Sequence, residues 1–365
     1  MEILAIVIIG FAWIQLGVAL SNLPLKLPEA PPEELYGQLS ILIPARNEEK
    51  TLPLLLHDLL EQHPHPLEII ICDDHSEDQT YALASKWTGQ YPCLRIFRGE
   101  ELPPGWLGKN FACYQLARQA RGNYLLFLDA DVRIGEQGIL PVLSLAKQKG
   151  TALLSVFPRQ MLLTPGEKAT VPLMTYILLT LLPLRLVYRV PGQSALAAAN
   201  GQFMLFEAAS YRHIQPHRVV RSEAVEDVAI SRLYKKSGRH IACLTGISEI
   251  SCRMYTSRRE AISGFARNIA GFFGGSLLLA LLFWLLTGWG WLVVLQAFSW
   301  SALLAYLVLR TVIRLVVAYD CRQPAGTNVF YSVFQQGNMG LILGQAWKSR
   351  RKGVLKWKGR NILNP

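Results

Sequence analysis

Two aspartates follow directly on an apolar segment of the sequence. In 121-RGNYLLFLDADVRIG-135, the apolar run 124–128 ends at Asp129 and Asp131, which one alanine separates. Alternate residues of an extended chain point to the same side, so the two carboxylates can converge. Carboxylate oxygens suit Mg²⁺ and Mn²⁺, which keep coordination positions open for phosphate oxygens. The pattern indicates either a metal site or a turn that aspartates stabilise.

Two further acidic pairs could act on the same ligand. Asp73 and Asp74 end the apolar segment 67–74, where a carboxylate can accept hydrogen bonds from a nucleobase N–H or from ribose hydroxyls. Glu226 and Asp227 open the segment 225–241, and Asp227 is a candidate general base for an acceptor hydroxyl. The alternatives are local ones, namely an Asx-type turn for the first pair and compensation of a helix dipole for the second.

The region between residues 38 and 265 must position these pairs, and its pattern alternates strands with helices. Strands are expected at 39–45, 67–74, 93–99 and 123–131, and helices at 50–62, 76–90 and 109–122. This alternation predicts an α/β fold in which a mostly parallel sheet is flanked by helices. Ligands of such sheets bind beyond the carboxyl ends of the strands, and the polar residues gather at those ends.

Apolar segments outside this region are long enough for a membrane. Residues 3–20 carry no charge, so 1–22 is expected to be a transmembrane anchor, with a signal peptide as the alternative. Residues 270–317 have the length of two transmembrane helices. Segment 169–187 is interrupted by prolines and is interpreted as interfacial, while 328–347 carries amides and is interpreted as a third membrane-associated segment.

The distribution of charge argues against a nucleic-acid partner. The net charge is +11, but the basic residues gather beside apolar segments, at 310–322 and in the tail 348–365. Basic flanks of this kind face the cytoplasm and anionic lipid. We therefore expect an integral membrane protein whose domain 38–268 and basic tail are cytoplasmic. The six cysteines show no metal-ligand spacing, which is typical of a reducing compartment.

The order of the motifs is more specific than any one of them. The chain reads 44-PARNE-48, then Asp-Asp, then 105-GWLGKN-110, then Asp-Ala-Asp, then Glu-Asp, and over about 38–270 this resembles glycosyltransferase family 2. Members of this family are inverting enzymes with a Rossmann-like GT-A fold that use nucleotide-activated sugars. The resemblance implies that Asp227 is the catalytic base and that Asp131 binds Mg²⁺ or Mn²⁺. It implies a nucleotide-sugar site made of Pro44, Ala45, Arg46, Glu48, Asp73, Asp74, Lys109 and Asp129, with Lys109 approaching the diphosphate.

Shorter stretches narrow the resemblance further. Segments 103–115, 199–206, 225–232 and 357–360 are similar to the membrane-anchored carotenoid and hopene-associated glycosyltransferases. Where that subgroup usually has Gly-Gly-His after Tyr-Arg, this chain has 211-YRHIQPH-217, so its acceptor loop is expected to differ. The acceptor region implied by the resemblance is Gly201, Gln202, His217, Glu226 and Arg267. No QxxRW follows the Glu-Asp pair, and this absence favours the addition of a single sugar over processive synthesis.

The sequence therefore predicts a metal-dependent, inverting transfer of one sugar to a hydroxyl of a lipid-like acceptor, such as a carotenoid or a similar isoprenoid, at the membrane. A UDP-sugar is the first expectation for the donor and a GDP-sugar the second. Two alternatives stay open. One is a polyprenyl-phosphate or ceramide glycosyltransferase, and a phosphate acceptor needs no strong base. The other is a non-catalytic membrane-bound binding protein.

Overall fold

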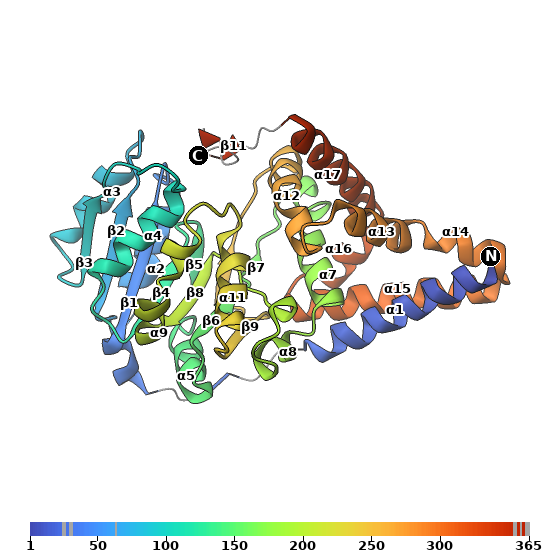
Figure 1. Cartoon of the computed structure of the whole chain (residues 1–365), viewed down its shortest axis with the longest axis horizontal. Coiled ribbons are helices and arrows are strands. Elements are labelled where there is room, and N and C mark those ends of the chain that lie inside the picture. Colours follow the sequence, from blue (N-terminus) through green and yellow to red (C-terminus); the bar gives the residue numbers. More distant parts are fainter. Residues whose placement is uncertain (24–26, 29–31, 63, 353–355, 358–359, 362–365) are drawn as a thin grey trace. The chain divides into compact units, whose positions relative to one another are not determined.

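The computed structural model describes residues 1–23, 27–28, 32–62, 64–352, 356–357 and 360–361, and it consists of two compact units (Figure 1). One unit, here called the helical unit, comprises Met1–Pro24, Gln160–Arg185 and Arg253–Lys356. The other, here called the sheet unit, comprises Leu25–Arg159, Leu186–Cys252 and Trp357–Pro365. Each unit is therefore assembled from segments that lie far apart in the sequence.

The sheet unit is built on one seven-stranded sheet with the order β3-β2-β1-β4-β8-β6-β9. Its strands are β1 (Leu39–Ala45), β2 (Glu68–Asp73), β3 (Leu94–Arg98), β4 (Tyr124–Leu128), β6 (Leu153–Val156), β8 (Phe203–Glu207) and β9 (Ile241–Leu244). Only β8 runs antiparallel to its neighbours, so the expectation of a mostly parallel sheet is confirmed. In this register Leu128 lies opposite Phe203, which brings the start of β8 to the carboxyl end of β4.

Helices pack around this sheet. They are α2 (Leu52–Leu60), α3 (Thr80–Thr88), α4 (Gly108–Gln119), α5 (Leu140–Lys149), α9 (Ala208–Ile214), α10 (Pro216–Val219) and α11 (Glu226–Lys236), with the short helices η1 (Glu33–Gln38) and η2 (Ser194–Leu196) and with α8 (Leu184–Arg189) at the junction of the two units. The short strands β5 (Val132–Ile134) and β10 (Ile250–Cys252) pair antiparallel, and β7 spans Arg159–Gln160. Apolar side chains of β1, β2 and β4 form the core with those of α2 and α5, and α4 packs on β1 and β2.

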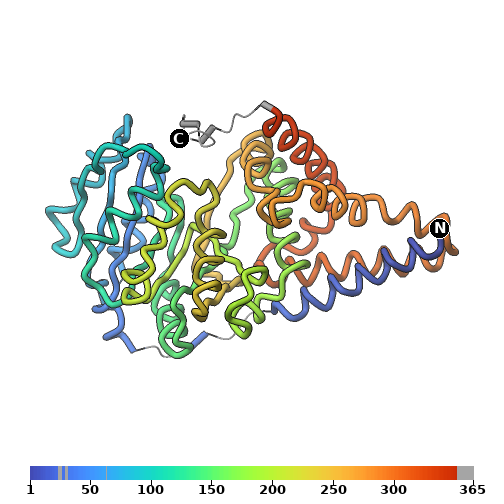
Figure 2. Tube along the Cα trace, in the orientation of Figure 1, coloured from blue at the N-terminus to red at the C-terminus, as the bar shows by residue number. Residues whose placement is uncertain are grey.

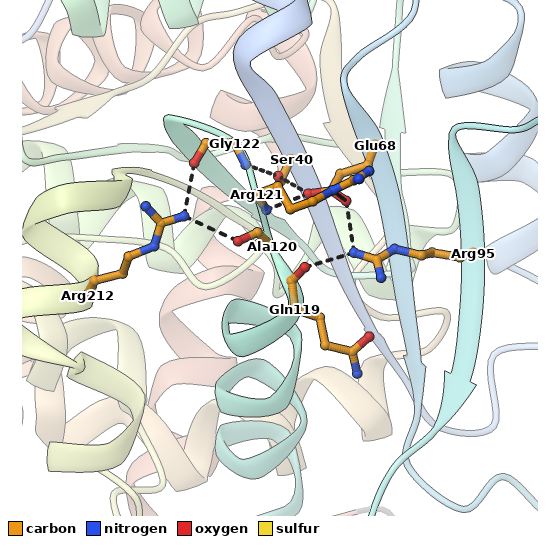
Figure 3. Close-up of polar contacts among 8 residues, drawn as sticks. All are labelled: Ser40, Glu68, Arg95, Gln119, Ala120, Arg121, Gly122 and Arg212. Atoms are coloured by element: carbon orange, nitrogen blue, oxygen red, sulfur yellow. Dashed lines mark hydrogen bonds and ion pairs between the residues drawn. The ribbon is translucent and has the colours of Figure 1, made fainter.

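A buried carboxylate fixes the edge of the sheet away from the carboxyl strand ends. Glu68, at the start of β2, is 1% exposed and accepts hydrogen bonds from Ser40 Oγ and Arg121 N, both at 2.6 Å, and from Arg95 Nη2 at 2.8 Å (Figure 3). Burial disfavours the charged form, yet these donors hold the pKa of Glu68 below its usual range. From α9, Arg212 donates to the carbonyl of Ala120. The amino ends of β1 and β2 and the turn before β4 are thus joined.

The helical unit contains α1 (Glu2–Ser21), α6 (Pro165–Lys168), α7 (Pro172–Leu181), α12 (Arg258–Phe272), α13 (Leu277–Gly288), α14 (Gly290–Ala297), α15 (Trp300–Asp320), α16 (Ala325–Phe330) and α17 (Ser332–Lys352), and the short strands β11 (Lys356–Trp357) and β12 (Arg360–Asn361) follow. Figure 2 shows the blue N-terminal helix α1 alongside the orange α15. Helices α1 and α15 are each long and apolar enough to cross a membrane, and the pair α12 and α13, bent by 104°, could form a third span.

The structure locates the predicted membrane segments without testing their topology. The anchor expected at 1–22 coincides with α1, and the segment 270–317 contains α13, α14 and most of α15. The interfacial segment 169–187 holds α7 and the start of α8, while 328–347 falls in α16 and α17. Most of the basic tail 348–365 lies outside the residues whose side chains are described. The number of spans and the cytoplasmic side of the sheet unit stay predictions.

Candidate active site

Hydrogen bonds join the loops after β1 and β2, where the acidic pair Asp73 and Asp74 lies. Arg46, the residue after β1, donates from Nη1 to the carbonyl of Asp74 at 2.6 Å, and Asn47 N donates to Ser76 Oγ at 3.0 Å. Because Ser76 is used in this way, the helix expected from residue 76 begins only at Thr80. Asp73 is 2% exposed, and its Oδ1 has no hydrogen-bond partner among the described residues. A buried acceptor without a donor suits a nucleobase N–H or a ribose hydroxyl.

A buried lysine joins the two other acidic pairs. Lys109, on the first turn of α4, places its Nζ 2.8 Å from Asp129 Oδ1 and 2.9 Å from Glu226 Oε1. Asp129 follows β4 and Glu226 opens α11, so three separate elements meet at one ammonium. Burial works against the charge, but the two carboxylates raise the pKa of Lys109 well above its usual value. The lysine is therefore a fixed cation at the carboxyl end of the sheet.

Asp131 forms no ion pair with the described basic residues. Its Oδ1 is buried and has no hydrogen-bond partner among the described residues, and the carboxyl contacts the thiol of Cys252. Burial, and then the negative charges of Asp129 and Glu48, raise the pKa of Asp131 to about 7. A carboxylate with an unpaired buried oxygen and a raised pKa fits a divalent cation, which would restore its charge. No group of three or more His, Cys, Asp or Glu in the described part of the chain could hold a metal alone.

Asp227 occupies a position suited to a general base. Its Oδ2 accepts from Gly201 N at 2.9 Å and its Oδ1 from Val228 N at 2.7 Å. Burial, and then the charge of Glu226, raise the pKa of Asp227 to about 7, while Lys109 and the two N–H donors lower it. A carboxyl that titrates near neutrality takes up a proton most effectively at physiological pH.

Gly201 lies in close contact with these groups. A Cβ atom at this position would lie 3.0 Å from Glu226 Oε1 and 3.1 Å from Lys109 Nζ. Any larger residue would therefore push the ion pair apart or move the backbone N–H away from Asp227. The glycine lies just before β8, and the antiparallel course of that strand brings it to the carboxyl end of β4.

The residues expected around the acceptor are only partly brought together. Gly201, Gln202 and Glu226 lie with the carboxylates, and the carbonyl of Gln202 accepts from Asp129 N at 3.2 Å. His217 is 2% exposed within an aromatic cluster, where its Nδ1 lies 2.6 Å from the hydroxyl of Tyr211. Burial lowers the pKa of His217 to about 3, which favours a neutral, structural imidazole. Arg267 belongs to α12 of the helical unit.

Two residues of the site have roles that the sequence did not predict. Cys252, at the end of β10, lies between Asp131 and Gln202, whose Nε2 is 2.7 Å from the thiol sulfur. A single cysteine in an apolar strand cannot be distinguished from an ordinary core residue. Asn110 is 1% exposed and donates to the carbonyls of Val220, Arg221 and Glu223, which fixes the loop before α11. Asn110 belongs to the stretch 105-GWLGKN-110, in which only Lys109 had a predicted role.

Comparison with known proteins identifies a similar family and similar sequences. Residues 40–206 match the model of the family described as glycosyl transferase family 2. The chain is 27% identical over 241 residues to a 4,4'-diaponeurosporenoate glycosyltransferase of Staphylococcus haemolyticus, with 65% of this chain and 62% of that protein covered. It is 25% identical over 349 residues to the protein of the same name from Staphylococcus aureus strain USA300, with 89% and 88% covered.

The fold has a solved counterpart as well. The mannosyltransferase PcManGT from Pyrobaculum calidifontis, solved in complex with GDP-Man and Mn²⁺, superimposes with a TM-score of 0.57 at 15% identity, over 95% of this chain and 98% of that one. The GT-A expectation from the sequence is thus confirmed. Residues 40–206 are similar to glycosyltransferase family 2, and the chain as a whole is similar to carotenoid-associated glycosyltransferases.

Proposed function

We propose that this glycosyltransferase moves one sugar from a nucleotide-sugar donor to a lipid-like acceptor, with inversion at the anomeric carbon. The observation that carries the proposal is the arrangement of Asp227 beside Lys109. A base and a fixed cation lie at the carboxyl end of one sheet, where such folds bind their ligands. The carotenoid glycosyltransferases with which the chain aligns over most of its length support the lipid-like acceptor.

The charges of the site support a divalent cation with the donor. Asp129 and Glu226 already share the Lys109 ammonium, which leaves Asp131 to meet an anionic diphosphate. Repulsion between them would oppose binding of the donor. Mg²⁺ or Mn²⁺ held by Asp131, with diphosphate oxygens and water as its other ligands, would supply the compensating charge and stabilise the leaving group. PcManGT was solved with Mn²⁺ and GDP-Man, which supports a divalent ion and a nucleotide sugar in this fold.

Asp73, Lys109 and Asp227 have separate roles in the transfer. Asp73 accepts a hydrogen bond from the nucleobase or ribose through its unpaired Oδ1. Lys109 places positive charge where the diphosphate leaves, and donors fixed in advance stabilise developing charge most effectively. Asp227 takes the proton of an acceptor hydroxyl as its oxygen attacks the anomeric carbon from the face opposite the diphosphate.

The name of the relatives points to a second nucleophile. A diaponeurosporenoate is a carotenoid carboxylate, so the acceptor group of those proteins can be a carboxylate oxygen instead of a hydroxyl. An ionised carboxylate has no proton to lose and needs no general base. A polyprenyl-phosphate acceptor shares this property. The dependence of the rate on Asp227 therefore distinguishes a hydroxyl acceptor from an acidic one.

The test is release of nucleoside diphosphate by the purified protein in detergent with Mn²⁺. UDP- and GDP-sugars would be offered with an apolar alcohol, an apolar carboxylic acid, a polyprenyl phosphate and a ceramide. Asp131→Ala should abolish turnover, while Glu136→Gln, a change at an exposed acid, should leave it unchanged. Asp227→Asn should stop transfer to alcohols only. If no donor and acceptor pair gives turnover, the proposal is wrong and the binding-protein alternative is favoured; if Asp131→Ala turns over as fast as the natural protein, the role of Asp131 is wrong.

We further propose that the sheet unit faces the cytoplasm. The support is the basic stretch 348–360, which follows the candidate spans in the sequence; the arginines at 310 and 314, expected to flank a span, lie within α15 instead. Intact inside-out vesicles treated with protease should lose the sheet unit, and right-side-out vesicles should retain it. The opposite pattern would reverse the orientation.

A further inference from the structure

Two arginines lie within the apolar helices of the helical unit. Arg310 stands near the middle of α15, a candidate span, and Arg314 follows one turn later on the same face. Helix α15 packs on α1 and α7, which bring Gln15 and Tyr176 to these arginines. Charged side chains inside membrane helices are costly and usually mark a functional site.

The partners of both guanidiniums are neutral. Arg310 donates from Nη1 to Gln15 Oε1 at 3.0 Å and from Nη2 to the carbonyl of Thr287 at 2.9 Å. Arg314 donates from Nη1 to Gln335 Oε1. The ring of Tyr176 lies 4.1 Å from the Arg314 Cζ and 5.8 Å from the Arg310 Cζ. Among the residues that the structure describes, neither arginine is paired with a carboxylate.

Hydrogen-bond donors are therefore in excess at this place. Each guanidinium has five N–H donors, and most of those on Arg310 and Arg314 have no acceptor among the described residues. Two neighbouring groups are also unsatisfied. Within the part of the chain that the structure describes, the hydroxyl of Tyr176, 1% exposed, has no hydrogen-bond partner, and neither does Nε2 of the Gln15 amide whose oxygen binds Arg310. Buried polar groups without partners indicate a missing ligand, and here the missing atoms are acceptors.

We infer that Arg310, Arg314, Tyr176 and Gln15 form a binding site for an anionic oxygen group carried on the end of an apolar molecule. A carboxylate or a phosphate would fill it, because guanidiniums bind both through paired charge-assisted hydrogen bonds. Arg310 is partly exposed while Arg314 is 6% exposed, so an anion can reach the pair from the side of Arg310. The outward residues of α15, including Leu304, Leu307 and Val308, are exposed and apolar, which favours a ligand dissolved in the membrane.

Ligand binding by the full-length protein in detergent tests this inference. Four probes would be compared. Oleate and dioleoylphosphatidylglycerol carry an anionic carboxylate and an anionic phosphate. Oleyl alcohol and dioleoylphosphatidylcholine are their uncharged and zwitterionic counterparts with the same apolar chains. Native mass spectrometry would give the bound fraction, and the shift of the apparent melting temperature would give an independent measure. At least one of the two anionic probes should bind about tenfold or more tighter than its uncharged or zwitterionic counterpart, as expected for charge-assisted hydrogen bonds. Preference for oleate assigns a carboxylate, and preference for the phospholipid assigns a phosphate.

Four variants identify the groups responsible. Arg314→Gln should lose the tenfold preference, Arg314→Lys should retain part of it, and Tyr176→Phe should weaken it by removing only the hydroxyl. Arg259→Gln, which removes an exposed guanidinium of α12, should bind as the natural protein does. The lysine variant guards against a folding defect, because it keeps the charge at the same place. Equal binding of charged and uncharged probes, or an unchanged preference in both Arg314→Gln and Tyr176→Phe, would overturn the inference. Release of nucleoside diphosphate from the nucleotide-sugar donor, measured with a soluble acceptor, tests glycosyl transfer separately.

Discussion

Replacing Lys109 by glutamine should destabilise the sheet unit in a manner that depends on pH. The ammonium forms ion pairs of 2.8 and 2.9 Å with Asp129 and Glu226, and its side chain is only 22% exposed. Removing one partner of a buried ion pair costs about 3–5 kcal/mol, because the remaining charge is left uncompensated. At about 2–4 °C for each kcal/mol in a domain of this size, the apparent melting temperature should fall by roughly 10 °C at pH 8.

The sign of the pH dependence follows from the pKa values of the Asp129 and Glu226 carboxyls. In the natural protein Lys109 helps hold the pKa of Glu226 below its usual value, so this stabilisation is present above the unfolded pKa and is lost on acidification. In the variant the buried carboxyls have folded pKa values above their unfolded ones, so the folded state takes up protons and is relatively favoured at low pH. The difference in melting temperature should therefore be larger at pH 8 than at pH 5.

Thermal unfolding of the full-length protein in detergent measures this difference. Scans at pH 5 and pH 8, with and without Mn²⁺ and UDP, would compare the natural protein, Lys109→Gln and the control Lys147→Gln, whose lysine is exposed on α5. Mn²⁺ should recover part of the loss in Lys109→Gln, because a second cation can compensate the same carboxylates. A difference in melting temperature between Lys109→Gln and the natural protein that is equal at both pH values, or that grows on acidification, would refute the ion-pair argument.

Three further outcomes are expected. For an alcohol acceptor, the natural protein's turnover should rise with pH to a plateau above about 7, following the pKa of Asp227. Asp227→Asn should lower this turnover roughly 10²–10⁴-fold. A turnover that is constant from pH 5 to pH 9 would contradict the assignment of Asp227 as the base. Cys252→Ala should raise the Mn²⁺ concentration for half-maximal turnover about tenfold, because the thiol contacts Asp131, whereas Cys93→Ala should not. Glu68→Gln should lower stability by about 2 kcal/mol at pH 7 and by progressively less on acidification, as the natural carboxyl takes up a proton, while KM for the donor stays the same.

The parallel part of the sheet was predictable because its strands are continuous apolar runs separated by helical segments. The direction of β8 was not, since an antiparallel strand buried on both faces has the same apolar pattern as a parallel one. Helix starts were displaced for a tertiary reason. Ser76 could cap a helix by its type, but its hydroxyl accepts from Asn47 in the neighbouring loop, and Asp78 accepts from Glu49 N at 3.2 Å. Such bonds depend on two loops meeting, which no local pattern contains.

At the site too, the sequence indicated the type of each functional residue but not the residues that it contacts. Spacing and resemblance selected Lys109 as a cation for the diphosphate, and the structure shows its ammonium already held by both carboxylate oxygens of Asp129 and by one of Glu226. These two descriptions are compatible. The pairs fix the ammonium where α4, β4 and α11 meet, and a cation fixed before the substrate arrives needs no reorganisation when charge develops on the leaving diphosphate. The same sharing leaves Asp131 without a cation of its own, which its raised pKa and unpaired Oδ1 reflect. The buried lysine thus accounts for both the positive charge offered to the donor and the separate need for a divalent ion.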